Sequence, residues 1–390
     1  MKILSPSIAA QLADFAYKSI AVSAAGDQSK KIKSNPIISK HFAFDSKTST
    51  LTGVSGTTAE HVLNQSTGFG FFGVGKGTGN YAGEIVIAIR GTAGLADALT
   101  DLHCGVTAGP NLAPVHSGFN RTFETIKPQL AAILSKAGGR PVHCIGHSLG
   151  GALATLAANW IKAQYKVPVK LYTFGSPRVG LNPFAIKTET SLDGIYRAVH
   201  RSDPVAMVPV WPFVHAGNEY RLSTCVSLTG AAHKMAGNAP GYINTAASYP
   251  DYKSMQKGSI SNLTMTRLKY YNRHHASFNA HWSEKITSAL ITLLRESGKL
   301  TSIMGQIGTS GVLTIYDLLA RSIVEISQMS TKFAEDSKGL IGHILNFVGK
   351  PFVAVDITYA GVKKALTWML EKLKTLVIAA VKVSPHIAFG

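Results

Sequence analysis

Hydrophobic and polar positions over the first 250 residues alternate between strand-like and helix-like patterns. Short runs that are mostly apolar predict strands, and longer amphipathic or small-residue stretches between them predict helices. The predicted strands cover residues 68–75, 84–90, 142–145, 169–174 and 195–200, and the predicted helices cover residues 6–25, 117–137 and 149–166. Because strands and helices alternate, we expect an α/β fold with a mostly parallel central sheet and helices on its faces.

The pattern changes after about residue 250. Helices are predicted over residues 283–299, 312–336 and 359–383, and no confident strand appears. No uncharged apolar run reaches the ~18 residues of a membrane-spanning helix. We therefore predict three parts, namely a catalytic domain over residues 1–250, a connecting segment over 251–282 and a helical domain over 283–390.

The charge of the chain indicates its partners. The 39 basic and 21 acidic residues give a formal net charge of +18, and the basic residues are spread along the chain. Such a field favours anionic partners. Since no zinc-finger spacing or RNA-binding aromatic signature accompanies it, we expect a membrane surface and no nucleic acid. The three cysteines, Cys104, Cys144 and Cys225, are too few and too widely spaced for a disulfide framework or a metal site, and we expect no cofactor.

The first residues do not have the pattern of a secretory signal. One lysine is followed by apolar residues that Ser5, Ser7, Gln11 and Asp14 interrupt. We therefore expect a chain that is made in the cytoplasm without a cleaved signal.

The strongest chemical signal is Gly146-His147-Ser148-Leu149-Gly150 between a predicted strand and a predicted helix. A serine hydroxyl is a weak nucleophile unless it is held exposed beside a general base. A sharp strand-to-helix turn holds it so, and this turn requires glycine on both sides. The positive end of the following helix favours a developing oxyanion. The pattern predicts Ser148 as the nucleophile of an ester hydrolase.

At this point the chain resembles the class 3, or fungal-type, lipases of the α/β-hydrolase fold. The resemblance covers roughly residues 10–250. Besides the elbow around Ser148, it rests on three motifs: Arg90-Gly91-Thr92, Val115-His116-Ser117-Gly118-Phe119 and Thr173-Phe174-Gly175-Ser176-Pro177-Arg178-Val179-Gly180. The residues after 250 have no counterpart in the fungal enzymes. A second likeness is to the lipase effectors that bacterial type VI secretion systems inject into rival cells.

The resemblance implies roles for further residues. The oxyanion hole of the family maps onto the backbone N–H groups of Thr92 and Leu149. The acid follows a later strand and precedes a proline-containing turn, which Asp203 fits. Asp193 is the rival, but it precedes the strand and is followed by glycine, as a turn residue would be.

The general base is chosen from 14 histidines. His233 resembles the base of bacterial members, which lies in a short His-x-Met run. His215 resembles a family histidine that is not the base. The alternatives, if the base lies past the domain boundary, are His274, His275 and His281.

The lid of the family follows the strand that ends at Arg90. Here that segment is residues 93–113, where Leu95, Leu99, Leu102 and Val106 have the spacing of one apolar helical face. An ordinary surface helix is the alternative. The C-terminal helices could also cover the site, contact the membrane, or pack on the sheet.

These observations predict a phospholipase of A1 type that uses Ser148, His233 and Asp203. The alternatives are a triacylglycerol or small-ester lipase without a toxin role, and a membrane-binding module without turnover. The likeness to secretion effectors implies an antibacterial toxin with a cognate inhibitor (immunity) protein and a component of the secretion apparatus as partners. It also implies delivery to the periplasm or membrane of a target cell.

Overall fold

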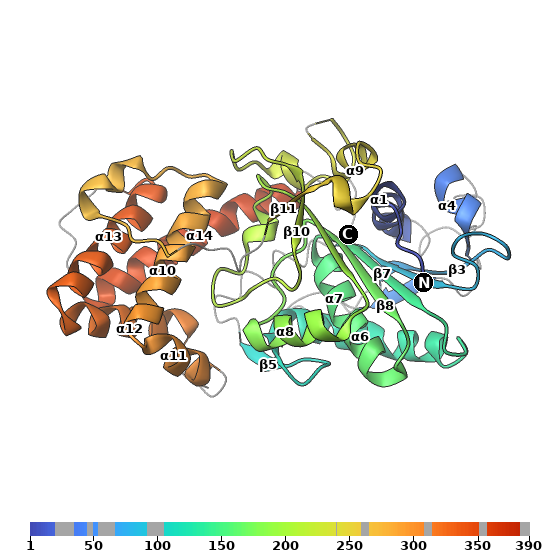
Figure 1. Ribbon diagram of the computed structural model, residues 1–390, viewed down its shortest axis with the longest axis horizontal. Coiled ribbons are helices and arrows are strands. Elements are labelled where there is room, and N and C mark those ends of the chain that lie inside the picture. The colour runs from blue at the N-terminus through green and yellow to red at the C-terminus, as the bar shows by residue number, and fades with distance from the viewer. Residues whose placement is uncertain are drawn as a thin grey trace.

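A mixed sheet forms the centre of the catalytic part (Figure 1). The computed structural model describes residues 1–19, 35–44, 50–53, 67–91, 105–238, 240–258, 265–307, 314–350 and 357–382. The strands of the sheet lie in the order β1-β3-β4-β7-β8-β9-β10-β11, and β2 pairs with β3 off this path. Their bounds are β1 (Phe42–Ala43), β2 (Thr50–Gly53), β3 (Thr67–Gly75), β4 (Ile85–Ile89), β7 (Val142–His147), β8 (Val169–Phe174), β9 (Ile195–His200), β10 (Glu219–Ser223) and β11 (Gln256–Gly258).

The five strands from β4 to β10 are parallel, whereas β1, β2 and β3 pair antiparallel at one edge and β11 pairs antiparallel at the other. Every residue of β4, β7 and β8 is buried, as expected for parallel strands covered on both faces. In Figure 1, helices α1 (Pro6–Phe15) and α9 (Tyr242–Ala247) cover one face. Helices α6 (Ser117–Leu134), α7 (Leu149–Tyr165) and α8 (Asn182–Ser191) cover the other. The predicted α/β-hydrolase architecture is confirmed.

The predicted lid lies mostly outside the described residues, and this includes Leu95, Leu99 and Leu102. Val106 is described, and it does not belong to a helix. It begins β5 (Val106–Ala108), which forms a small antiparallel pair with β6 (Pro114–His116). Pairing with β6 satisfies the backbone of this segment, so the single apolar helical face predicted for residues 93–113 is wrong at its C-terminal end.

Five helices follow the sheet in the described part of the chain (Figure 1): α10 (Ala280–Glu296), α11 (Lys299–Ile307), α12 (Ile315–Met329), α13 (Thr331–Phe347) and α14 (Tyr359–Lys382). The sequence predicted one helix over residues 312–336, but the structure has two, which separate at Ser330. The backbone of Ser330 is extended and its hydroxyl accepts a hydrogen bond from the backbone N–H of Phe333, so this residue caps α13. The expectation of no strand after residue 250 is also wrong, because β11 pairs with β10.

Buried apolar faces hold the helical region together. Ile323 of α12, Leu340 of α13 and Leu373 of α14 are each at most 1% exposed and belong to one continuous core with the residues of the sheet. Within the described residues, no helix is long and apolar enough to cross a membrane. The buried apolar residues named above pack between the helices.

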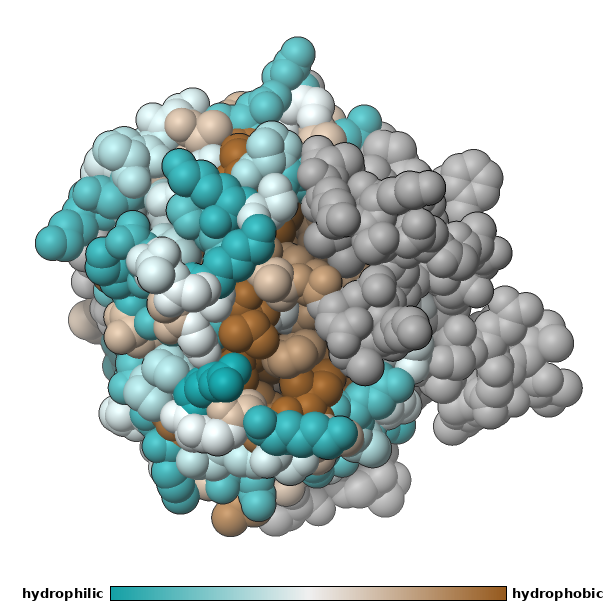
Figure 2. Space-filling view, turned by 90° about the vertical axis from the view of Figure 1, so that its right-hand side faces the viewer, coloured by the Kyte–Doolittle hydropathy of each residue, from teal (hydrophilic) through white to brown (hydrophobic). Residues whose placement is uncertain are grey.

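Hydrophobic side chains also reach the surface at the opposite end of the molecule. Figure 2 views the end where α4 (Pro36–His41) and β3 lie and shows a band of hydrophobic residues through a mainly hydrophilic face. The described large apolar residues with exposed side chains include Ile3 and Ile37. This band and the helical region therefore lie at opposite ends of the protein.

Candidate active site

Ser148 lies on a sharp turn between β7 and α7. Its backbone has φ 59° and ψ −134°, a conformation that a residue with a side chain rarely adopts. The turn leaves no room beside it, because a Cβ atom on Gly150 would lie 2.2 Å from the carbonyl oxygen of Ile89. Ser148 is buried, and its Oγ atom has no hydrogen-bond partner among the described residues. The local geometry is that of a nucleophile elbow.

Asp203 and His233 form a buried pair at the end of the sheet. Nδ1 of His233 lies 2.9 Å from Oδ2 of Asp203, and both side chains are fully buried. Asp203 follows β9, and His233 ends the short 3-10 helix η4 (Gly230–His233). Since the carboxylate can only accept, Nδ1 donates to it, and in a neutral imidazole Nε2 is then the acceptor. No described residue hydrogen-bonds to that Nε2 atom.

Two further groups fix the carboxylate of Asp203. Its Oδ1 atom accepts from the backbone N–H of Val205 at 2.9 Å, and its Oδ2 atom accepts from the hydroxyl of Tyr242 at 2.7 Å. Burial raises the pKa of Tyr242 well above its ordinary value, so this phenol remains a donor. Gly175, with φ +52°, lies against the group, and a Cβ atom there would be 2.4 Å from Oδ2 of Asp203. The acid is therefore held by donors on three sides.

A chain of hydrogen bonds passes beneath Ser148. Nε2 of His147 lies 2.8 Å from the carbonyl oxygen of His233, to which it must donate. Its Nδ1 atom then accepts from the hydroxyl of Tyr17 at 2.6 Å, and that hydroxyl accepts from the backbone N–H of Gly91 at 3.2 Å. The rings of His147 and His233 also stack, with 4.5 Å between their centroids. His147 thus supports the backbone of His233 and is not itself paired with Asp203.

The two predicted oxyanion donors are the backbone N–H groups of Leu149 and Thr92. Leu149 opens α7, so its backbone N–H belongs to the first turn, where N–H groups have no partner within the helix. Thr92 lies outside the described residues. Gly91, which precedes it, lies against Ser148, because a Cβ atom on Gly91 would be 2.7 Å from Cβ of Ser148.

The rival acid lies in a different setting from Asp203. Oδ2 of Asp193 accepts from Nζ of Lys162 at 2.6 Å and from the backbone N–H of Val169 at 2.8 Å, both at the other end of the strands. The structure therefore gives Asp193 contacts that fit a turn residue.

The rival histidines lie apart from the buried acid. His215 donates from Nε2 to the carbonyl of Ala206 at 2.7 Å, and burial lowers its pKa well below the usual value. The other three are exposed, in the short helix η7 (Tyr270–His275) and at the start of α10: His274, His275 and His281. The described structure thus brings only His233 to Asp203 among the histidines considered from the sequence.

The sequence did not indicate the roles of Tyr17 or Tyr242. Tyr17 lies more than one hundred residues from its partner His147, and Tyr242 lies 39 residues from Asp203. No local motif marks either residue.

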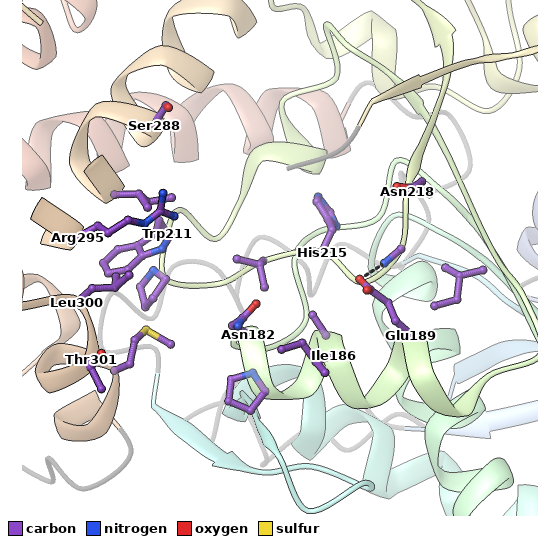
Figure 3. A pocket seen from close by; sticks show the side chains of 18 of the residues that line it. Asn182, Ile186, Glu189, Trp211, His215, Asn218, Ser288, Arg295, Leu300 and Thr301 are labelled. Atoms are coloured by element: carbon purple, nitrogen blue, oxygen red, sulfur yellow. Dashed lines mark hydrogen bonds between the residues drawn. The ribbon is translucent and has the colours of Figure 1, made fainter. Parts of the chain in front are cut away.

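A separate cavity of about 890 Å³ lies between the catalytic part and the helical region (Figure 3). Its walls include Asn182 and Ile186 of α8, Trp211, and Arg295 of α10. Ser148, Asp203 and His233 do not line it, so it is not the space in which an acyl group would react. In the described part of the chain, no group of three or more His, Cys, Asp or Glu side chains could hold a metal ion.

A serine on an elbow and an imidazole oriented by a carboxylate are the groups that acyl transfer through a serine requires. Comparisons with known proteins also point to lipases. Residues 86–213 match the family model described as lipase (class 3). A secreted mono- and diacylglycerol lipase of Fusarium solani is 34% identical over 172 residues, which cover 41% of this chain and 50% of that protein.

Two other relatives are named for a phospholipase activity and for a toxin. A chloroplastic phospholipase A(1) of Arabidopsis thaliana is 35% identical over 150 residues, covering 32% of this chain and 34% of that protein. The toxin TseL of Vibrio cholerae is 38% identical over 99 residues, which cover 25% of this chain and 15% of that protein. A mono- and diacylglycerol lipase of Aspergillus oryzae has a similar structure, with a TM-score of 0.44 and 22% identity over 63% of this chain and 91% of that one.

These comparisons correct one prediction. Relatives from Fusarium solani, Gibberella zeae and Penicillium cyclopium are named as secreted lipases. The predicted localisation, a cytoplasmic product without a signal that a secretion system delivers to a target cell, is therefore wrong, because these relatives are named as secreted proteins.

The similarity does not extend over whole proteins. The chain spans about half the length of the Fusarium enzyme, and a smaller share of the Arabidopsis phospholipase and of toxin TseL. The similarity is centred on the segment that holds the four motifs of the sequence. Residues 86–213, which include Ser148 and Asp203, therefore match the class 3 lipase family, as those motifs predicted.

Proposed function

We propose that the protein is a serine hydrolase that cleaves the carboxylic esters of membrane lipids. The observation that carries the proposal is the buried Asp203–His233 pair, whose Nε2 atom and the Oγ atom of Ser148 both lack partners among the described residues. Buried polar groups are nearly always paired, so an unpaired hydroxyl at the elbow and an unpaired imidazole nitrogen in η4 indicate groups reserved for a reaction.

In the proposed reaction, His233 acts as the general base. Its Nε2 atom takes the proton of Ser148 Oγ, which attacks the acyl carbonyl and forms a tetrahedral intermediate. The backbone N–H of Leu149, with that of Thr92, stabilises the oxyanion. His233 then protonates the leaving alcohol, and water cleaves the acyl-enzyme by the same steps. Asp203 keeps the imidazole in the required tautomer and stabilises its protonated form.

For the substrate we propose glycerophospholipid, cleaved at the first acyl position. Two observations support it. The net charge of +18 would concentrate the protein on anionic lipid, and the Arabidopsis relative is named a phospholipase A(1). Mono- and diacylglycerol, which the fungal relatives are named for, are the alternative substrates.

Product analysis separates these substrates. The purified protein is incubated with vesicles of mixed phosphatidylglycerol and phosphatidylethanolamine, and separately with emulsified diacylglycerol and triacylglycerol. We expect lysophospholipid that keeps its second acyl chain, and no product with Ser148→Ala. Release of fatty acid only from the neutral lipids would replace the phospholipid proposal with a glyceride lipase. No product from any ester would refute the hydrolase.

A role as an antibacterial toxin is a second candidate, and the 38% identity to toxin TseL over 99 residues favours it. In that case an inhibitor protein would be the partner. Expression of the protein in the periplasm of a test bacterium should then stop growth, while Ser148→Ala should not. If both forms were equally toxic, damage would come from membrane binding without turnover.

A further inference from the structure

The helical region contacts the loop that carries Asp203 through an ion pair. Nε of Arg201 donates to Oε1 of Glu284 at 3.0 Å, and its Nη2 atom donates to Oε2 at 2.6 Å. Arg201 directly follows β9 and precedes Asp203 by two residues, while Glu284 lies in the second turn of α10. Two parallel hydrogen bonds between a guanidinium and a carboxylate fix orientation as well as distance. This pair therefore links α10 to the acid loop.

A second contact reaches the loop that carries His233. The last turns of α14 pack on η4, where a Cβ atom on Gly230 would lie 2.9 Å from Cα of Ala380. Ala380 and Val381 are buried. With 24 residues, α14 is about 36 Å long, and Figure 1 shows it reaching from the other helices to the sheet near β10 and β11. One rigid element thus joins the helical region to the base loop.

The two loops are also tied to each other. The backbone N–H of Thr229 donates to the carbonyl of Ser202 at 3.2 Å, and Nδ1 of His200 donates to the carbonyl of Ala232 at 2.7 Å. A displacement of one loop is therefore transmitted to the other. The hydrogen bond between Asp203 and His233 lies between them and would change with either.

We propose that the helical region positions the acid and the base, with Glu284 and Ala380 as its positioning residues. The proposal rests on the proposed function, since it assigns Asp203 and His233 to the reaction. The region has no role in binding substrate in this scheme. It holds the two loops at the separation that the hydrogen bond requires, and a shift of about 1 Å at such a site is enough to slow a reaction greatly.

The first test changes Glu284 to Gln, which keeps the shape and removes the charge. With a soluble short-chain ester, we expect kcat to fall about tenfold at unchanged KM, together with a shift of the pH profile of kcat/KM. The matched control is Glu296→Gln in the same helix, whose partners Arg267 and Lys332 lie away from the acid and base loops. We expect the control to keep the wild-type kcat and pH profile.

The second test acts on α14. Ala380→Leu adds volume where α14 meets Gly230, whereas Ala379→Leu adds the same volume at an exposed position of the same helix. We expect a loss of about tenfold in kcat for the first variant and no change for the second. Circular dichroism shows whether the variants are folded. If Ala380→Leu does not fold, Glu284→Gln alone tests the proposal.

A readout without turnover separates this proposal from the proposed function. The proton between Nδ1 of His233 and Asp203 gives a downfield NMR resonance, which should shift or broaden in Glu284→Gln and not in Glu296→Gln. If the wild-type protein cleaved no ester, the hydrolase would be refuted while this resonance still tested the positioning. Glu284→Gln and a folded Ala380→Leu with unchanged kcat, pH profile and resonance would overturn the proposal.

Discussion

The hydroxyl of Tyr242 donates to Oδ2 of Asp203 at 2.7 Å, and this is the same oxygen that lies 2.9 Å from Nδ1 of His233. The hydroxyl also accepts from the backbone N–H of His200 at 3.2 Å. One phenol therefore joins the acid to the end of β9. Its removal leaves a buried N–H and a carboxylate lone pair without a partner.

Tyr242→Phe tests this contact. We expect the free energy of unfolding to fall by about 1–3 kcal/mol, because a buried hydrogen-bonding group loses its partner. We also expect kcat to fall about tenfold, because the carboxylate loses one of its three donors and is held less firmly. Urea unfolding and ester hydrolysis measure the two effects. Wild-type stability and kcat would show that the hydroxyl supports neither group.

Ser148→Gly tests the strain at the elbow. Since Ser148 has φ 59° and ψ −134°, glycine should adopt the same turn at lower cost and raise the free energy of unfolding by about 1–2 kcal/mol. Ester hydrolysis should be lost at the same time. Thermal unfolding of Ser148→Gly beside Ser148→Ala, which keeps the Cβ atom, separates the strain from the missing hydroxyl. Equal melting temperatures would contradict strain.

His233→Ala should be as damaging as Ser148→Ala, with both below about a thousandth of the wild-type rate. The double variant should be little worse than either, because the residues of a triad act as one unit. His275→Ala and His281→Ala are the matched controls and should stay active. An inactive control beside an active His233→Ala would place the base after the domain boundary.

Stability should fall in mild acid because of His215. Burial lowers its pKa in the folded protein, whereas the unfolded chain has the ordinary value near 6.5. Above about pH 6.5 both states are neutral and the stability is unchanged. As the pH falls below that value, the unfolded state binds the proton first and stability decreases by up to about 1.4 kcal/mol per pH unit. Melting temperatures from pH 7.5 to 5 measure the slope, which His215→Gln should reduce.

Deletion of residues 283–390 should give an aggregating protein. The deletion removes Glu284 and uncovers the surface of η4 on which Ala380 packs. Size-exclusion chromatography of the truncated chain measures the outcome. A monomer that cleaves a short-chain ester at the full rate would show that these helices form a separable module.

Local patterns predicted the sheet and the elbow well. The apolar runs at 84–90 and 142–145 correspond to β4 and β7, and the glycines around Ser148 predicted its turn. Such features depend on a few neighbouring residues, so the sequence displays them. The family resemblance added Asp203 and His233, which the structure places 2.9 Å apart.

Contacts between distant residues could not be predicted in the same way. Tyr17, His147 and the carbonyl of His233 form one hydrogen-bonded chain although they come from three separate segments. The division of residues 312–336 at Ser330 was missed because its helical pattern continues on both sides of the cap. Pairing partners and caps depend on the assembled fold, which periodicity does not describe.

Gly175 contributes no functional group, yet it limits which sequences can carry this site. An added methyl group would lie 2.4 Å from Oδ2 of Asp203, 2.9 Å from the hydroxyl of Tyr242 and 3.1 Å from Nδ1 of His233. In a saturation library of the chain, every other residue at position 175 would collide with the first two groups and make an unusually tight contact with the third. Position 175 would therefore tolerate no replacement, although glycine there takes no part in the chemistry.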